Sequence, residues 1–110
     1  MRLEVVFYRT AAGKEPVREW LQQLPKADRR SIGIDLKTVQ FGWPLGMPLV
    51  RKLEPGIWEV RSDLDRRIAR VLFTVADEDM VLLHGFIKKS QKTPTVDIER
   101  ARSRKADLEN

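Results

Sequence analysis

The chain has 110 residues, of which 42% are hydrophobic, and a formal net charge of +5. This length is too short for two separate hydrophobic cores, so we expect a single domain over residues 1–110. The absence of cysteine excludes disulfides and thiolate metal sites, and no apolar run is typical of a signal peptide or a membrane span. We therefore expect a soluble, cytoplasmic protein that does not bind a membrane.

The N-terminal part predicts one strand and two helices. Residues 3–8 are rich in β-branched and aromatic side chains, which favours a strand. The next apolar residues recur at helical spacing, which predicts a helix over residues 15–24 with Pro16 in its first turn. A second helix is expected to begin near Lys26 and to end at Gly42, with Ile32, Leu36 and Val39 on its buried side.

The middle of the chain predicts antiparallel strands. Residues 41–48 hold two glycines and two prolines and should form a loop. Strands 49–53 and 57–61 flank Pro55-Gly56, where glycine suits a turn that needs positive φ. A turn is expected at residues 62–65, followed by strands 67–76 and 80–87.

The C-terminal part predicts a polar loop over residues 88–92 and a last helix that ends near Asp107. Thr93 is the expected N-cap, with Pro94 at the first helical position. The order of elements predicts an α+β architecture: a small antiparallel sheet, two N-terminal helices packed on one face, and a C-terminal helix.

Alternation along the strands indicates which side chains share a face. Trp58 and Val60 fall on one side of their strand, whereas Glu59 and Arg61 fall on the other. Arg70 lies opposite the apolar side of the next strand. If the apolar sides face the helices, Arg61 and Arg70 share an open face that the loop at residues 88–89 can reach.

The positive charge is concentrated near the C-terminus. Residues 88–105 hold seven Lys or Arg against two acids, and the rest of the chain is balanced. Such a segment is typical of a site that neutralises phosphates, although a solvated basic helix has the same composition. We interpret it as a polyanion-binding segment, and we expect the polyanion to be RNA.

The sequence has no Gly-rich phosphate loop, no nucleophile motif and no metal-ligand spacing, so neither a metal nor a cofactor is expected. RNA supplies its own nucleophile, the 2′-hydroxyl. A protein can promote its attack by orienting that oxygen and by neutralising the phosphate in the transition state. Arginine suits the second task because its planar, permanently charged fork matches phosphate oxygens, and clustered lysines could assist proton transfer.

Three segments resemble the phage-derived HigB-like toxins of the RelE/ParE superfamily. They are residues 84–94 followed by Ile98-Glu99-Arg100-Ala101, residues 53–61, and residues 67–73. The resemblance covers nearly the whole chain in the right order. It implies a RelE-like fold, a type II toxin–antitoxin toxin, and ribosome-dependent, metal-free cleavage of messenger RNA that inhibits translation. It also implies a cognate antitoxin, in this subgroup often a helix-turn-helix, HigA-like protein.

The resemblance also assigns roles to residues. Arg61 and Arg70 match residues that contact the scissile phosphate, and Lys88 or Lys89 matches the basic end of the last strand; these four are the catalytic candidates. The RNA-binding candidates are Lys52, Gln91, Lys92, Arg100 and Arg104. Two positions depart from the family pattern, because the only tyrosine is Tyr8 in the first strand and Glu59 stands where some members have lysine.

Other interpretations remain open at this point. His84 is a possible catalytic group or a packed structural histidine, and the three tryptophans are core residues more often than base-stacking ones. Arg61 and Arg70 would also suit ordinary ion pairs with Glu59 or nearby aspartates. The alternative functions are a non-catalytic, ParE-like toxin that binds DNA gyrase and a basic RNA-binding protein that does not cleave. The last helix could instead bind an acidic antitoxin segment.

Overall fold

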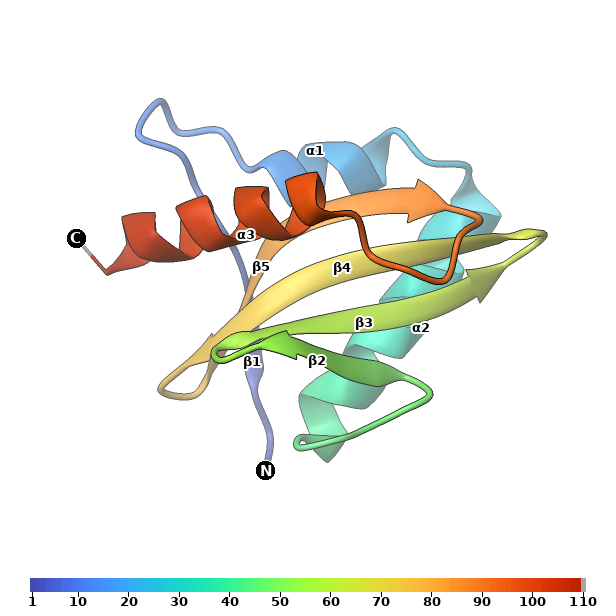
Figure 1. Ribbon diagram of the computed structural model, residues 1–110, viewed down its shortest axis with the longest axis horizontal. Coiled ribbons are helices and arrows are strands. Elements are labelled where there is room, and N and C mark those ends of the chain that lie inside the picture. The colour runs from blue at the N-terminus through green and yellow to red at the C-terminus, as the bar shows by residue number, and fades with distance from the viewer. Residues whose placement is uncertain (110) are drawn as a thin grey trace.

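The computed structural model describes residues 1–109 and arranges three helices and five strands in a mixed α+β fold (Figure 1). The elements in chain order are β1 (Glu4–Phe7), α1 (Pro16–Gln22), α2 (Lys26–Gly42), β2 (Val50–Glu54), β3 (Ile57–Leu64), β4 (Arg67–Ala76), β5 (Asp79–Lys88) and α3 (Thr95–Leu108). The predicted fold class is confirmed. In the described part of the chain, no helix is both long and apolar enough to cross a membrane.

The five strands form one sheet in the order β1-β5-β4-β3-β2. Strands β2 to β5 are antiparallel neighbours, as expected for a run of hairpins. Strand β1, however, pairs with β5 in parallel, so the sheet is mixed and not antiparallel throughout. A parallel pair needs a long connection, and here most of the chain separates the two strands.

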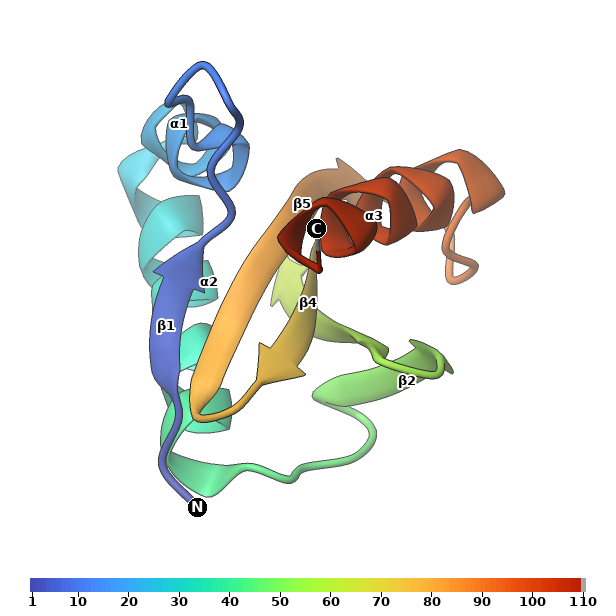
Figure 2. The same cartoon turned by 90° about the vertical axis from the view of Figure 1, so that its left-hand side faces the viewer.

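The helices lie on both faces of the sheet (Figure 2). Helices α1 and α2 cover one face, where Val17, Ile32 and Val39 pack on apolar side chains of the strands. Helix α3 covers part of the other face, where Ala101 packs with Leu72 and Leu83. The expectation that Arg61 and Arg70 share an open face is therefore wrong, because a second apolar cluster holds α3 over that face.

Most predicted boundaries are confirmed, with two exceptions. Helix α2 has both predicted ends, and Gly56 takes the expected positive φ, 81°. Strand β3 runs through the turn predicted at residues 62–65, because Ser62 and Asp63 pair with β4 and move the turn to Asp65-Arg66. Thr93 is not a helix cap: Pro94 precedes the first turn of α3, and the Thr93 hydroxyl donates to Glu59 instead.

The tryptophans pack in or against the core, which agrees with the interpretation that they are core residues and not base-stacking ones. Trp43 is 9% exposed and meets Trp58 edge to face, with 5.1 Å between ring centroids. Phe73 of β4 completes the cluster, at 5.5 Å from Trp43. This cluster fixes the segment that follows α2 against the sheet, and so sets where β2 begins.

At Gly85 in β5, the Trp20 ring of α1 lies directly against the sheet. A Cβ atom placed on Gly85 would lie 2.4 Å from the Trp20 ring. We expect Gly85→Ala to lower the free energy of unfolding by about 1–3 kcal/mol, because the ring and α1 must shift. Urea unfolding would measure this loss. The matched control is Gly33→Ala in α2, where nothing lies within 4 Å of the added atom and a gain of up to about 1 kcal/mol is expected. Equal effects of the two changes would contradict this account.

Candidate functional site

A buried carboxylate between two arginines forms the centre of the site. Arg61 on β3 and Arg70 on β4 are cross-strand partners, so both side chains lie on the α3 face with Glu59. The Glu59 carboxylate lies 3.1 Å from Nη1 of Arg61 and 3.8 Å from Nε of Arg70. Glu59 and Arg70 are fully buried. One negative charge thus faces two positive charges away from water.

The loop between β5 and α3 covers this cluster with its own oxygen atoms. Nη1 of Arg70 donates to the Lys92 carbonyl at 2.8 Å, and Nη2 donates to the Ser90 carbonyl. Arg61 donates to the side-chain oxygen of Gln91 at 2.7 Å and to its carbonyl at 3.3 Å. Protein oxygens therefore occupy the positions on both guanidinium groups that phosphate oxygens would take.

Thr93 fastens the end of the loop to the same carboxylate. Its hydroxyl donates to Glu59 Oε1 at 2.5 Å, and both groups are buried. Glu59 thus connects β3 to Thr93, two residues before α3 begins, as well as binding Arg61. Nε of Arg70 has no hydrogen-bond partner among the described residues, so the charge of this guanidinium is only partly compensated.

A third arginine, which sequence reasoning missed, stands beside the cluster. The β2–β3 register pairs Arg51 with Glu59, which puts Arg51 on the α3 face, and its positive charge contributes to lowering the pKa of Arg70. Burial is the largest cause of that lowered pKa, and Glu59 opposes it. Lys52 pairs with Trp58 and lies on the opposite face, where its ammonium is 5.9 Å from the Trp58 ring centre. The signal that could have found Arg51 is the hairpin register about Gly56.

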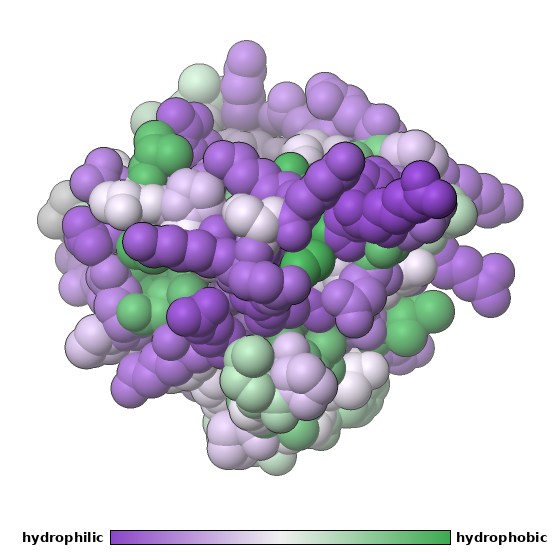
Figure 3. All heavy atoms as spheres, turned by 45° about the vertical axis from the view of Figure 1, so that its right-hand side comes forward, coloured by the Kyte–Doolittle hydropathy of each residue, from purple (hydrophilic) through white to green (hydrophobic). Residues whose placement is uncertain are grey.

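The exposed lysines surround this cluster. Lys88 ends β5 and falls by alternation on the same face as Phe86 and Arg70, and Lys88, Lys89 and Lys92 are all exposed. A hollow of about 170 Å³ lies beside them and is lined by Arg51, Lys52, Leu53, Lys92, Thr93 and Ile98. The side of the molecule that carries the residue 88–92 loop and the β3–β4 turn is mostly hydrophilic (Figure 3). Positively charged side chains at the surface thus lie next to the buried arginines.

Comparison with known proteins identifies the family. The family model described as Phage derived protein Gp49-like (DUF891) matches residues 19–106, from α1 to the last turns of α3. The chain belongs to this Gp49-like family. The family is associated with RelE-like, toxin-like proteins, which confirms the coarser part of the resemblance seen in the sequence. No curated protein matches the chain.

In the Gp49-like chain, His84 has its own partner on α3. Its Nε2 donates to the Asp97 carboxylate at 2.7 Å, and its ring stacks on Phe86. The side chain is 15% exposed. These contacts fit a structural histidine, which was one of the two interpretations, and they explain its place between β5 and α3.

The stability of the Gp49-like chain should depend on pH through His84. Burial lowers the pKa of His84 below its ordinary 6.5, although Asp97 acts in the opposite direction. As pH falls through about 6.5, the unfolded chain binds the proton first, so folding weakens until the lowered pKa is reached. Urea unfolding at pH 7.5 and 5.5 should show this loss in the wild type and less of it in His84→Gln. Parallel losses in the two proteins would argue against it.

Two arginines of α3 contact the sheet. Arg104 donates to the Leu83 carbonyl at 2.7 Å, and Arg102 forms an ion pair with Glu54 at 2.7 Å. Burial lowers the pKa of Arg104. Arg100 is exposed, so of the two RNA-binding candidates on this helix only Arg100 has a free approach from solvent. The Tyr8 hydroxyl donates to Asp107 at 2.6 Å and fixes the other end of the helix.

The Gp49-like fold thus brings some sequence-predicted residues together and separates others. Arg61, Arg70, Gln91 and Lys92 meet at Glu59, whereas His84 and Arg104 contact α3 or β5 and Lys52 points to the other face. Within residues 1–109, no three His, Cys, Asp or Glu side chains are grouped so as to hold a metal ion. The arrangement offers guanidinium groups for an anion and exposed amines close by.

Proposed function

We propose that this Gp49-like protein is the toxin of a type II toxin–antitoxin pair and an endoribonuclease that cuts messenger RNA on the ribosome. The observation that carries the proposal is the pair of Arg61 and Arg70 at the buried Glu59 carboxylate, with the exposed Arg51 beside them. An excess of buried positive charge costs free energy unless an anion compensates it. A phosphodiester of RNA is an anion of the right charge and geometry.

The reaction follows from the chemistry of RNA and needs no group beyond the chain's own side chains and the substrate. The 2′-oxygen attacks the adjacent phosphorus, the bond from phosphorus to the 5′-oxygen breaks, and the products are a 2′,3′-cyclic phosphate and a 5′-hydroxyl. Arg61 would stabilise the charge that builds on the phosphate oxygens. Lys88 or Lys89 would take the proton from the 2′-hydroxyl or help to return one to the 5′-oxygen.

The loop at residues 89–93 must move for this reaction to occur. Its carbonyl groups now accept hydrogen bonds from the guanidinium groups of Arg61 and Arg70. We propose that phosphate oxygens replace them when RNA binds, so that Arg61 contacts the scissile phosphate. Arg70 is fully buried and would then act chiefly by holding the loop and the Glu59 carboxylate in place.

The remaining candidates contribute to binding in this proposal. Arg51, Lys92 and Gln91 would contact the RNA backbone beside the scissile phosphate, and Arg100 would contact ribosomal RNA. A neighbouring helix-turn-helix, HigA-like antitoxin would neutralise the toxin. The contacts of Arg51, Lys92 and Arg100 with RNA are electrostatic and should weaken as salt increases.

Induction in cells tests the proposal. Expression of the chain alone should arrest growth, and mapping of RNA 5′ ends should show new cuts inside translated messages. Growth arrest with intact transcripts would contradict cleavage and favour a toxin that acts on another target, such as DNA gyrase. Growth without arrest would contradict a toxin altogether.

A further inference from the structure

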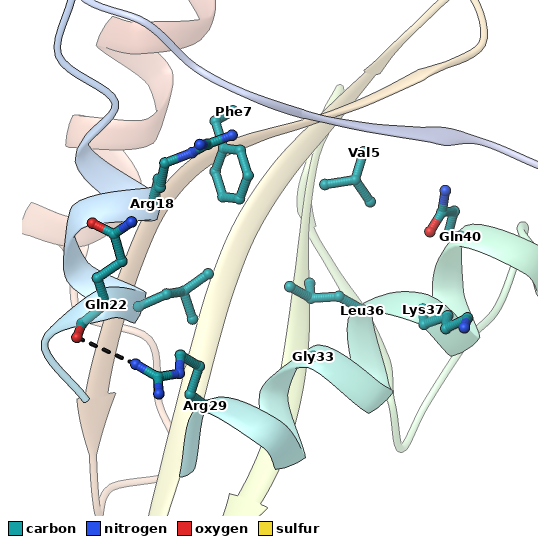
Figure 4. Close-up of a pocket in the computed structure, with 10 residues that line it drawn as sticks. Val5, Phe7, Arg18, Gln22, Arg29, Gly33, Leu36, Lys37 and Gln40 are labelled. Atoms are coloured by element: carbon teal, nitrogen blue, oxygen red, sulfur yellow. Dashed lines mark hydrogen bonds between the residues drawn. The ribbon is translucent and has the colours of Figure 1, made fainter. Parts of the chain in front are cut away.

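A second candidate binding site lies on the face of the sheet that α1 and α2 cover. A hollow of about 440 Å³ opens between β1, α1 and α2 (Figure 4). Its apolar lining comes from Val5 and Phe7 of β1, Leu21 of α1 and Leu36 of α2. The arginine cluster at Glu59 lies on the opposite face, so this groove has no part in the proposed RNA chemistry.

The rim of the groove is positively charged. Arg18, Arg29 and Lys37 line it, and none of the described lining residues is acidic, although Arg18 forms an ion pair with Glu15 just outside the groove at 3.0 Å. The Arg29 guanidinium donates to the Gln22 carbonyl at 3.3 Å, and the Arg18 guanidinium lies 4.9 Å from the centre of the Phe7 ring, next to the apolar floor. All three cations are exposed to solvent. An occupant would therefore meet apolar side chains below and positive charges at the edges.

We infer that this groove is the docking surface for an acidic, amphipathic segment of a protein partner. Apolar side chains of the segment would enter between α1 and α2, and carboxylates beside them would meet Arg29 and Lys37. The inference rests on the proposed function only in that a toxin requires a neutralising partner. The groove and the Glu59 cluster lie on opposite faces of the sheet, so the segment itself would not contact the proposed RNA site.

Gly33 is a position at which a substitution would reach this groove directly. It lines the hollow from α2, and an added Cβ would have nothing within 4 Å. A larger side chain at this position would begin in open space and extend over the groove. Gly33→Phe is therefore a variant that should block docking and leave the fold intact, since replacing glycine inside a helix does not weaken it.

A display library of 16-residue amphipathic helices tests the inference. Its apolar positions vary among Leu, Ile, Val and Phe, and its flanking positions vary among Glu, Lys and Ser. We expect clones selected on the wild-type chain to carry Glu at the flanks. Binding should weaken at least tenfold in Gly33→Phe and severalfold in Lys37→Glu. The matched control is Arg30→Glu, an exposed charge on the same helix that does not line the groove and should change little.

Several results would overturn the inference. Selected clones that carry Lys at their flanks, that bind Gly33→Phe as tightly as the wild type, or that shift amide resonances on α3 instead of α2 would each contradict it. A dimer in sedimentation that Gly33→Phe dissociates would show that a second copy of the chain covers the groove. The binding measurement contains no RNA, so failure of the nuclease proposal and failure of this inference are distinguishable.

Discussion

Replacing Glu59 by alanine is expected to lower the free energy of unfolding by about 3–5 kcal/mol, because it leaves two guanidinium groups buried without their carboxylate. Glu59 is fully buried, lies 3.1 Å from Arg61, and accepts a hydrogen bond from Thr93. The loss of these contacts should also release the start of α3. Urea unfolding followed by circular dichroism would measure the change.

Glu54→Ala is the matched control for that change. Glu54 lies in the same β2–β3 hairpin and pairs with Arg102 at 2.7 Å, but the Arg102 side chain is 56% exposed. Exposed ion pairs contribute little, so this variant should unfold almost like the wild type. A Glu59→Ala protein that is as stable as Glu54→Ala would show that the buried cluster does not hold the fold together.

Replacing Arg61 by alanine is expected to slow messenger RNA cleavage on the ribosome by about 10²–10³-fold, the loss typical of removing one transition-state donor. Of the two arginines at Glu59, Arg61 is the one that reaches solvent, with 9% of its side chain exposed. Its Nη1 and Nη2 atoms both donate hydrogen bonds to Gln91. Arg61→Lys should restore only part of the rate, since an ammonium keeps the charge but not the planar fork. Single-turnover cleavage by the folded variants would measure both effects.

The control for Arg61 is Arg30→Ala, an exposed position on α2 on the other face of the sheet. It should cleave at the wild-type rate. Full cleavage by Arg61→Ala would remove Arg61 from the mechanism, and full growth arrest without cleavage would favour a non-catalytic toxin. Arg70→Ala is less informative than the sequence suggested, because Arg70 is fully buried and its loss would also disturb the fold.

Much of the fold was predictable from local patterns. Helix α2 and the hairpin at Gly56 follow from helical spacing, Pro and Gly signals, and strand alternation, all of which are short-range features. Two features were not predictable. The parallel pairing of β1 with β5 depends on residues more than seventy positions apart, and the end of β3 depends on pairing with β4, which overrides the turn residues at 62–65.

The candidate site was predicted as a set of residues and not as an arrangement. Alternation correctly put Arg61 and Arg70 on one face, because the strand period determines the side of each residue. It could not show that α3 covers that face, since apolar positions of α3 such as Ala101 are few. Nor could it show that Arg51, and not Lys52, faces Glu59, because a one-residue change of register exchanges the two faces.

The chemistry of the cut ends is the measurement that tests the nuclease proposal most directly. Ribosomes translating a defined message would be incubated with the purified chain, and the fragments would be analysed for their termini. The proposal predicts a 2′,3′-cyclic phosphate on one fragment and a 5′-hydroxyl on the other, and no cut where the 2′-hydroxyl at that position is replaced by hydrogen. Fragments with 5′-phosphate ends, or cleavage that persists without the 2′-hydroxyl, would contradict it.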